Sequence, residues 1–382
     1  MTFSTLALVV ALGLCGPLFA LRTAWHVPVI LGELIAGIIF GATGFGVLHS
    51  ADPLFTFLAD MGFAVVMFVA GSRVPVRDPQ VRSALGVGAV RAILVGLPAA
   101  AAGFGIAHWF DTGHGAMYAV LLASSSAALV LPIIDSLGLT GAPVLALTAQ
   151  VAIADTACVV ALPLAIDPGN AGRAALGAAA VAGCAVVLFL LLRWSEKSGA
   201  RRRVHRISEE RKLALELRVS LAMLFALCAV ATQTRVSIML AGFAAGLAVA
   251  AIGEPRRVAK QLFAISDGFL APLFFVWLGA RLNLRDFGEH PHLIALGIAL
   301  GLGAVLVHLV PRLIGQPVGY GALAAAQIGV PVAAVTVGTA LDVLVKGEAA
   351  ALMLGALCTI AIAAVAANRL AAKAPANTTQ TA

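Results

Sequence analysis

The chain has 382 residues, of which 61% are hydrophobic and only 11% are charged, and its mean hydropathy is +1.02. Soluble domains usually carry about 25% charged residues, so this composition excludes a water-soluble globular protein, a disordered chain and a collagen-like one. The apolar runs are long and continuous, which also excludes an outer-membrane β-barrel. We therefore expect an all-α polytopic membrane protein. In a membrane protein, basic residues reflect the orientation of the loops, so the net charge of +7 does not indicate nucleic-acid binding.

Apolar stretches of about 20 residues, bounded by charged residues or by Gly and Pro, recur along the whole chain. We identify about thirteen candidate transmembrane helices, at 3–21, 27–48, 54–71, 84–110, 115–137, 142–166, 172–192, 213–232, 236–252, 261–280, 292–315, 319–341 and 348–367. They form one transmembrane domain over residues 1–373, with a polar cytoplasmic linker at about 193–212. We expect residues 374–382 to be a short disordered cytoplasmic tail and not a further soluble domain.

The basic residues are distributed unequally between the two ends of these spans. With the N-terminus outside, eighteen Lys and Arg residues fall on one side of the membrane and five fall on the other. Loops rich in Lys and Arg stay in the cytoplasm, so we expect a multi-pass protein of the cell membrane with its N-terminus outside and its C-terminus inside. That orientation requires an odd number of spans, which thirteen satisfies and eleven would satisfy as well.

Two of the spans contain residues that interrupt a helix. These residues are Ser124, Ser125, Ser126 and Pro132 in the span at 115–137, and Gln327, Gly329 and Pro331 in the span at 319–341. Pro removes an intrahelical hydrogen bond, and Ser can satisfy the backbone groups that are set free. Paired broken helices in the two halves of a chain indicate a transporter site at the interface of inverted repeats. A simple proline kink in each helix is the alternative.

Asp155 is the most deeply placed carboxylate, about a dozen residues from either end of the span at 142–166. A charge at that depth costs at least about 2.5–3.5 kcal/mol, so it needs water, an ion or a proton. Desolvation favours the protonated form, whereas a bound cation favours the ionised form. A proton and a cation therefore compete for this one carboxylate, as proton-coupled cation transport requires. A structural carboxylate bonded to neighbouring helices is the alternative.

Two further charged residues lie inside spans, Glu33 in the second and Arg91 in the fourth. Their estimated depths are similar, so we expect a structural charge pair, with a role in transport as the less favoured interpretation. The sequence contains no Walker A motif, no hydrolase motif and no Cys/His cluster with the spacing of a metal site. We therefore expect neither an enzyme nor a bound cofactor.

Four segments resemble the monovalent cation:proton antiporter superfamily, and in particular its Kef-type and bacterial sodium/proton exchanger branch. They are LGELIAGIIFGATGFGVL at 31–48, LADMGFAVVMFVAGSRV at 58–74, ASSSAALVLPIID at 123–135 and APLFFVWLGARLNL at 271–284. The resemblance implies two inverted repeats, a domain that forms a homodimer and a mobile core domain in which the two broken helices cross. It also implies that Asp155 binds the transported Na⁺ or K⁺ and the proton in turn, with Ser126, and Ser125 beside it, as hydroxyl ligands.

The sequence departs from the family pattern at three places. Ala154 precedes Asp155 where several branches have Asp, Asn or Gln, no lysine occurs near Gly303 or Ala304, and Val330 replaces an acidic residue. A single titrating carboxylate favours exchange of one cation for one proton, which is electroneutral.

The leading hypothesis is thus antiport of a monovalent cation against H⁺, with membrane lipid as the surroundings. Leak-type or organic-solute transport on the same scaffold, and a sensor that transports nothing, are the alternatives.

Overall fold

The computed structural model describes residues 1–21, 28–211, 213–234, 236–253 and 256–372. Within these ranges the α-helices are α1 (Phe3–Gly13), α2 (Cys15–Ala20), α3 (Val29–Phe40), α4 (Pro53–Ser72), α5 (Pro79–Trp109), α6 (Gly115–Ala123), α7 (Ala127–Ser136), α8 (Ala142–Ile166), α9 (Ala171–Lys197), α10 (Ala200–Glu210), α11 (Leu215–Gln233), α12 (Ile238–Ile252), α13 (Arg256–Ile265), α14 (Ala271–Arg281), α15 (Asp286–Glu289), α16 (His292–Leu309), α17 (Val318–Ala324), α18 (Gly329–Ala340) and α19 (Glu348–Ala371). The short elements are 3-10 turns at Pro168–Asn170 and Val310–Ile314 and a π-helical turn at Ser266–Leu270.

The polar linker is largely helical, because it begins as the end of α9 and continues as α10. The expected tail at 374–382 lies outside the described residues.

An all-helical membrane architecture is confirmed, but the count of thirteen full spans is not. In the described part of the chain, eleven helical stretches are long and apolar enough to cross a membrane. Two further apolar helices, α3 and α12, are shorter. At 1.5 Å per residue the twelve residues of α3 extend about 18 Å, which is less than the roughly 30 Å of a bilayer core.

The second expected span, 27–48, ends early because its C-terminal third is a loop. Gly41 ends α3 with an extended backbone, and Gly46 adopts a positive φ of 67° that favours glycine. The loop is held by the segment after α14: Thr43 donates to the carbonyl of Leu282, and Arg285 donates to the carbonyls of Thr43 and Gly44. These tertiary hydrogen bonds replace the helical ones that the apolar pattern predicts.

Two of the long spans begin at an Asp-Pro pair. The Asp52 carboxylate accepts hydrogen bonds from the amides of Leu54 and Phe55 at the start of α4. Asp78 accepts one from the amide of Gln80 at the start of α5 in the same way. Such caps satisfy amides that have no partner within the helix, and the following proline lacks the amide that would be left over. Local sequence thus places these two helix starts.

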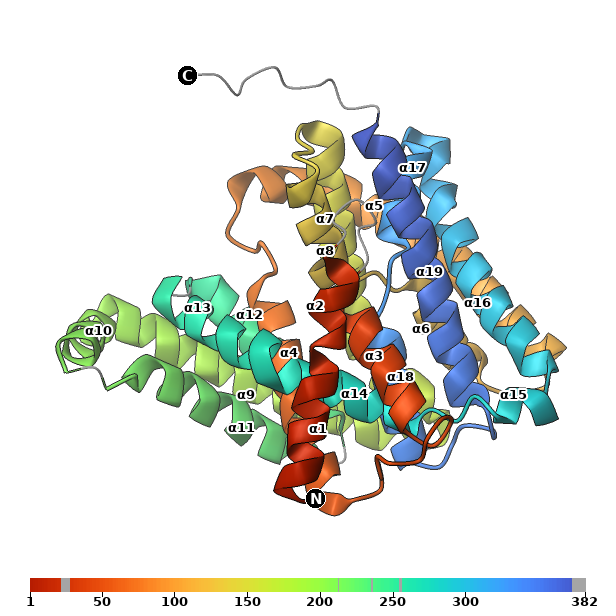
Figure 1. Cartoon of the computed structure of the whole chain (residues 1–382). Helices are drawn as coiled ribbons and strands as arrows, with labels where there is room; N and C mark the ends of the chain where they lie inside the picture. The colour runs from red at the N-terminus through yellow and green to blue at the C-terminus, as the bar shows by residue number, and fades with distance from the viewer. Residues whose placement is uncertain (22–27, 212, 235, 254–255, 373–382) are drawn as a thin grey trace.

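The helices pack in two groups; in Figure 1, α9, α11 and α12 of one group lie at the left, and α16, α17 and α19 of the other lie at the right. One group contains α3, α4, α9, α11, α12 and α14, and the other contains α5, α6, α16, α17, α18 and α19. Helix α8 lies between them, in contact with α9 and α12 on one side and with α5, α6 and α18 on the other. A residue at the centre of α8 is therefore placed where the two groups meet.

Glycines let the backbones within the first group approach closely. A Cβ atom at Gly37 would lie 2.2 Å from the carbonyl oxygen of Val276, and one at Gly246 would lie 2.1 Å from that of Phe68. The GxxxG spacings at Gly37/Gly41 and Gly242/Gly246 therefore mark the α3–α14 and α4–α12 contacts.

A buried acid ties α19 to α6 in the second group. Glu348 is fully buried, and its Oε1 atom accepts a hydrogen bond from the Tyr118 hydroxyl at 2.6 Å and lies 2.8 Å from His114 Nδ1. Its Oε2 atom accepts one from the amide of Val345 at 2.9 Å. The hydrogen bond with Glu348 raises the pKa of His114 above its usual value.

We expect the contribution of this histidine to stability to depend on pH. Because the pKa of His114 is raised on folding, the stabilisation is complete below the unfolded pKa of about 6.5 and is lost as the pH rises through the folded pKa. His114→Ala should lower the melting temperature of the detergent-solubilised protein by roughly 2–4 °C at pH 6, with the difference shrinking by pH 9. The exposed His49 offers a control, since it takes no part in the hydrogen bonds of Glu348. A pH-independent difference for His114→Ala would contradict this account.

Candidate ion-binding site at the helix crossing

Both expected helix breaks are present. Helix α6 ends at Ala123, residues 124–126 are not helical, and α7 begins at Ala127. Likewise α17 ends at Ala324 and α18 begins at Gly329.

The two prolines, however, do not lie at the breaks themselves. Pro132 is inside α7 and Pro331 is in the first turn of α18, where the missing amide has no intrahelical partner to lose. The breaks are made by the serine run and by the segment that contains Gln327.

The two non-helical segments cross and hydrogen-bond to each other. The amide of Ser126 donates to the carbonyl of Ala326 at 2.9 Å. The Ser124 hydroxyl donates to the side-chain oxygen of Gln327, and the Ser125 hydroxyl donates to the carbonyl of Ala324. Backbone groups released by the breaks are thereby satisfied in the protein interior, as an apolar membrane requires.

Asp155 lies directly at this crossing. Its carboxylate is 6% exposed, and Oδ2 accepts a hydrogen bond of 3.0 Å from the amide of Ala127, the first residue of α7. The positive end of the α7 dipole thus faces the acid. Its Oδ1 atom accepts no hydrogen bond from the described residues.

A small cavity of about 50 Å³, hereafter the site cavity, adjoins the carboxylate. Ser126, Asp155 and Gly329 line it together with apolar side chains such as Met67 and Phe274. Asp155 is the one charged group among the described residues of its lining. Ala154, Ala304 and Val330 are buried and supply no polar group nearby, in keeping with the departures seen in the sequence.

The structure separates the two serines that the sequence grouped as ligands. Ser126 lines the site cavity with Asp155, and its side chain does not cap α7. The Ser125 hydroxyl is bonded to Ala324 and lies 3.4 Å from Nε2 of His308, so it belongs to the crossing and does not line the site cavity. Successive side chains of an extended segment point to opposite sides, and the pattern of three serines does not show which side meets the acid.

Two residues that the sequence did not assign to the ion-binding site support the crossing. His308 of α16 is 1% exposed, and its Nδ1 atom lies 2.8 Å from the carbonyl of Ala304. The Thr359 hydroxyl of α19 accepts a hydrogen bond of 3.4 Å from the amide of Gln327. Each is an isolated polar residue in an apolar span, and this isolation is the feature of the sequence that points to a buried hydrogen-bonding role.

The expected charge pair between Glu33 and Arg91 is not formed. Arg91 lies in α5, is 6% exposed, and its Nε and Nη1 atoms have no hydrogen-bond partner in the described part of the chain. Glu33 lies in α3, in the other helix group, and its charge interacts with that of Asp267. Similar depth in the membrane does not place two helices side by side.

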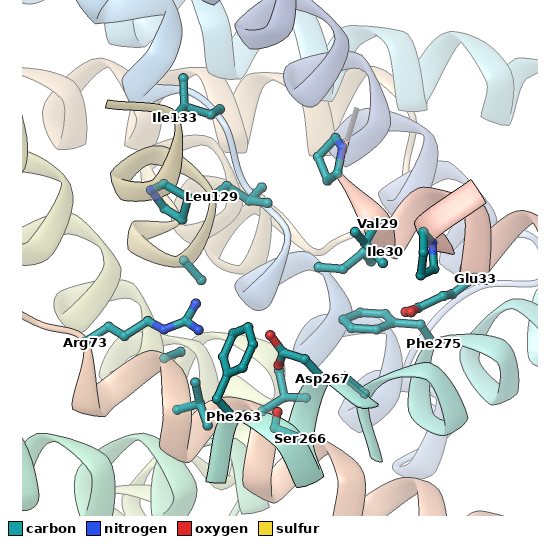
Figure 2. A pocket seen from close by; sticks show the side chains of 18 residues that line it. Val29, Ile30, Glu33, Arg73, Leu129, Ile133, Phe263, Ser266, Asp267 and Phe275 are labelled. Atoms are coloured by element: carbon teal, nitrogen blue, oxygen red, sulfur yellow. The ribbon is translucent and has the colours of Figure 1, made fainter. Parts of the chain in front are cut away.

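Glu33 and Asp267 line a second and larger cavity of about 630 Å³, hereafter the large cavity (Figure 2). It shares with the site cavity the side chains of Ile30, Val66, Ala70, Ala128 and Phe275. The two cavities therefore adjoin, and the large cavity lies between α7 on one side and α3, α4 and α14 on the other.

Comparisons with known proteins agree with this architecture. The chain is similar to the glutathione-regulated potassium-efflux system protein KefC of Enterobacter sp. (strain 638), with 28% identity over 69% of this chain and 42% of that protein. It is similar to KefC of Salmonella typhi, with 27% identity over 75% of this chain and 47% of that protein. The chain thus spans less than half the length of these curated relatives.

A solved structure of the sodium proton antiporter MjNhaP1 from Methanocaldococcus jannaschii has the same fold, with a TM-score of 0.67 and 19% identity. The match covers 97% of this chain and 98% of that one. The family profile described as "Sodium/hydrogen exchanger, transmembrane" matches residues 6–382. The chain therefore belongs to the transmembrane sodium/hydrogen exchanger family.

Proposed function

We propose that the protein exchanges a monovalent cation, Na⁺ or K⁺, for a proton across the cell membrane, with Asp155 binding the two in turn. The observation that carries the proposal is the buried Asp155 carboxylate at the first amide of α7, where two broken helices cross. Neutralisation by a proton or by a cation is the condition under which such a group crosses a low-dielectric region at low cost. A proton and a cation cannot both occupy it, so their movements are coupled.

The ligands that we propose for the cation are the free oxygen of Asp155 and the hydroxyl of Ser126, completed by water. Alkali cations are hard and take oxygen ligands. The relatives are named as potassium-efflux proteins and the structural neighbour as a sodium proton antiporter, and both ions suit this donor set. Since the site cavity contains one carboxylate among its described residues, we propose an electroneutral exchange of one cation for one proton.

The proposed orientation has the N-terminus outside and the C-terminus inside, as the distribution of basic residues indicates. Arg73 follows the third span and lies at the large cavity, so this orientation places that cavity on the cytoplasmic side. The state described here is then inward-facing. A homodimer is part of the proposal through the resemblance to the family.

Reconstitution of the full chain into liposomes that contain a pH-sensitive dye tests this function. Addition of Na⁺, K⁺ or Li⁺ to vesicles with an acidic interior should dissipate the pH gradient, and empty vesicles should show no response. Cation flux without proton movement would indicate a leak, and the absence of any cation response would overturn antiport. A strong dependence of the rate on an imposed membrane potential would contradict the one-for-one stoichiometry but not the antiport itself.

A further inference from the structure

Glu33 is a buried carboxylate to which the proposed exchange at Asp155 assigns no role. Its side chain is 2% exposed and forms no hydrogen bond or ion pair with the described residues. Figure 2 shows its carboxylate pointing into the large cavity from α3. A buried charge without a partner is strongly unfavourable, so this carboxylate is neutralised by a proton or by a bound cation in the working protein.

A second carboxylate faces the same space. Asp267 lies in the π-helical turn between α13 and α14 and also points into the large cavity (Figure 2). It is close enough to Glu33 for the two negative charges to interact unfavourably. A π-helical turn inserts an additional residue into a helix and is frequent at functional sites. Here it places the Asp267 carboxylate at the cavity.

Among the described residues of the lining, one basic group lies across the cavity but does not neutralise the two acids. Arg73 reaches in from the end of α4, with its guanidinium 5.3 Å from the centre of the Phe263 ring. Its charge interacts with that of Asp267. No ion pair within 4.0 Å joins Arg73 to Glu33 or Asp267 among the described residues, so the acids retain the capacity to bind a cation.

The position of these acids matters because the large cavity adjoins the site cavity. An ion held between Glu33 and Asp267 therefore lies next to the cavity that contains Asp155. Acidic groups in a cleft with apolar walls concentrate cations, since the field is focused where the dielectric constant is low.

We propose that Glu33 and Asp267 form a second cation-binding site, which takes a partly hydrated monovalent cation from the aqueous side and raises its concentration next to Asp155. This inference deepens the proposed antiport and rests on it. Carboxylate and water oxygens are the ligands that such a cation prefers. Glu33 provides the fixed, desolvated ligand, and Asp267 provides one at the cavity surface.

The kinetic test compares wild type with Glu33→Gln in the liposome assay. We expect the apparent KM for the cation to rise about tenfold, as for the loss of one charged ligand, while kcat stays within about twofold because Asp155 is intact. Asp135→Asn is the matched control, since Asp135 is an exposed acid at the end of α7 outside the lining of the large cavity and should leave both constants unchanged. An unchanged KM in Glu33→Gln, or a loss of kcat alone, would overturn the loading site.

A binding measurement keeps the inference testable if transport itself is not found. Calorimetric titration of K⁺ and Na⁺ into the Asp155→Asn protein should detect one remaining weak site, and the further change Glu33→Gln should remove it. Asp267→Asn replaces Glu33→Gln in both experiments if the latter does not fold. Equal binding with and without the Glu33 carboxylate would refute the second site, whereas a wild type that binds cations without exchanging them would refute only the antiport.

Discussion

Asp155→Asn should abolish cation-driven proton movement in proteoliposomes, with a loss of at least about a hundredfold in rate. The asparagine oxygen can still accept the hydrogen bond from the amide of Ala127, and its size matches that of aspartate. It can neither take up a proton at accessible pH nor neutralise a cation. The substitution therefore removes the exchangeable charge and preserves the crossing.

The control for this experiment is another acid within a span. Asp60 of α4 is half-buried and lies outside the linings of both cavities, so Asp60→Asn should retain most of the exchange. Elution of both variants as monodisperse species with the melting temperature of wild type would show that folding is preserved. If Asp155→Asn exchanged cations within tenfold of the wild-type rate, the proposed role of Asp155 would be lost.

Gly246→Ala should cause a large loss of stability through the addition of a single methyl group. The added Cβ atom would lie 2.1 Å from the carbonyl oxygen of Phe68 and 2.8 Å from the amide nitrogen of Ser72, both of which belong to the α4 backbone. Backbone atoms cannot rotate away, so α4 and α12 must separate. We expect about 3 kcal/mol of destabilisation, at the upper end of the usual cost of overpacking, and a lower apparent melting temperature in detergent.

Gly96→Ala is the control, because it makes the same substitution in another helix, α5. A Cβ atom at Gly96 would have no neighbour within 4 Å, so this change should be neutral or stabilising, because alanine favours a helix by up to about 1 kcal/mol over glycine. Gly242→Ala should behave like Gly246→Ala, since its Cβ atom would lie 2.5 Å from the carbonyl oxygen of Ala64. Similar melting temperatures for Gly96→Ala and Gly246→Ala would show that the α4–α12 contact is looser than the structure indicates.

Much of the candidate site follows from local sequence. Asp155 was identified because a single acid in a long apolar run is costly wherever the helix packs. The breaks were identified because Pro, Ser and Gly weaken a helix through their own backbone preferences, although Pro132 and Pro331 do not lie at the breaks themselves. Each of these signals arises within a few residues of the position it describes, so no knowledge of the neighbours was needed.

Other parts of the site depended on neighbours that lie far away in the chain. The separation of Ser126 from Ser125 is set by α17 and α16, which hold the Ser125 hydroxyl and leave that of Ser126 at the site cavity. The early end of α3 is set by hydrogen bonds to residues after α14. Hydropathy reports how apolar a segment is, and it does not report what the segment touches.

By itself, the amino-acid sequence determined that this chain is a helical membrane protein, where most of its helices run, where two of them break and which acid lies at mid-depth. Only the tertiary structure decided that Glu33 faces Asp267 and not Arg91, and that their cavity shares lining side chains with the cavity at Asp155. The physical reason is that periodicity and composition act along one chain segment. The choice of partner across helices depends on the close approach of backbones at glycines such as Gly37 and Gly246, and that approach exists only in the packed molecule.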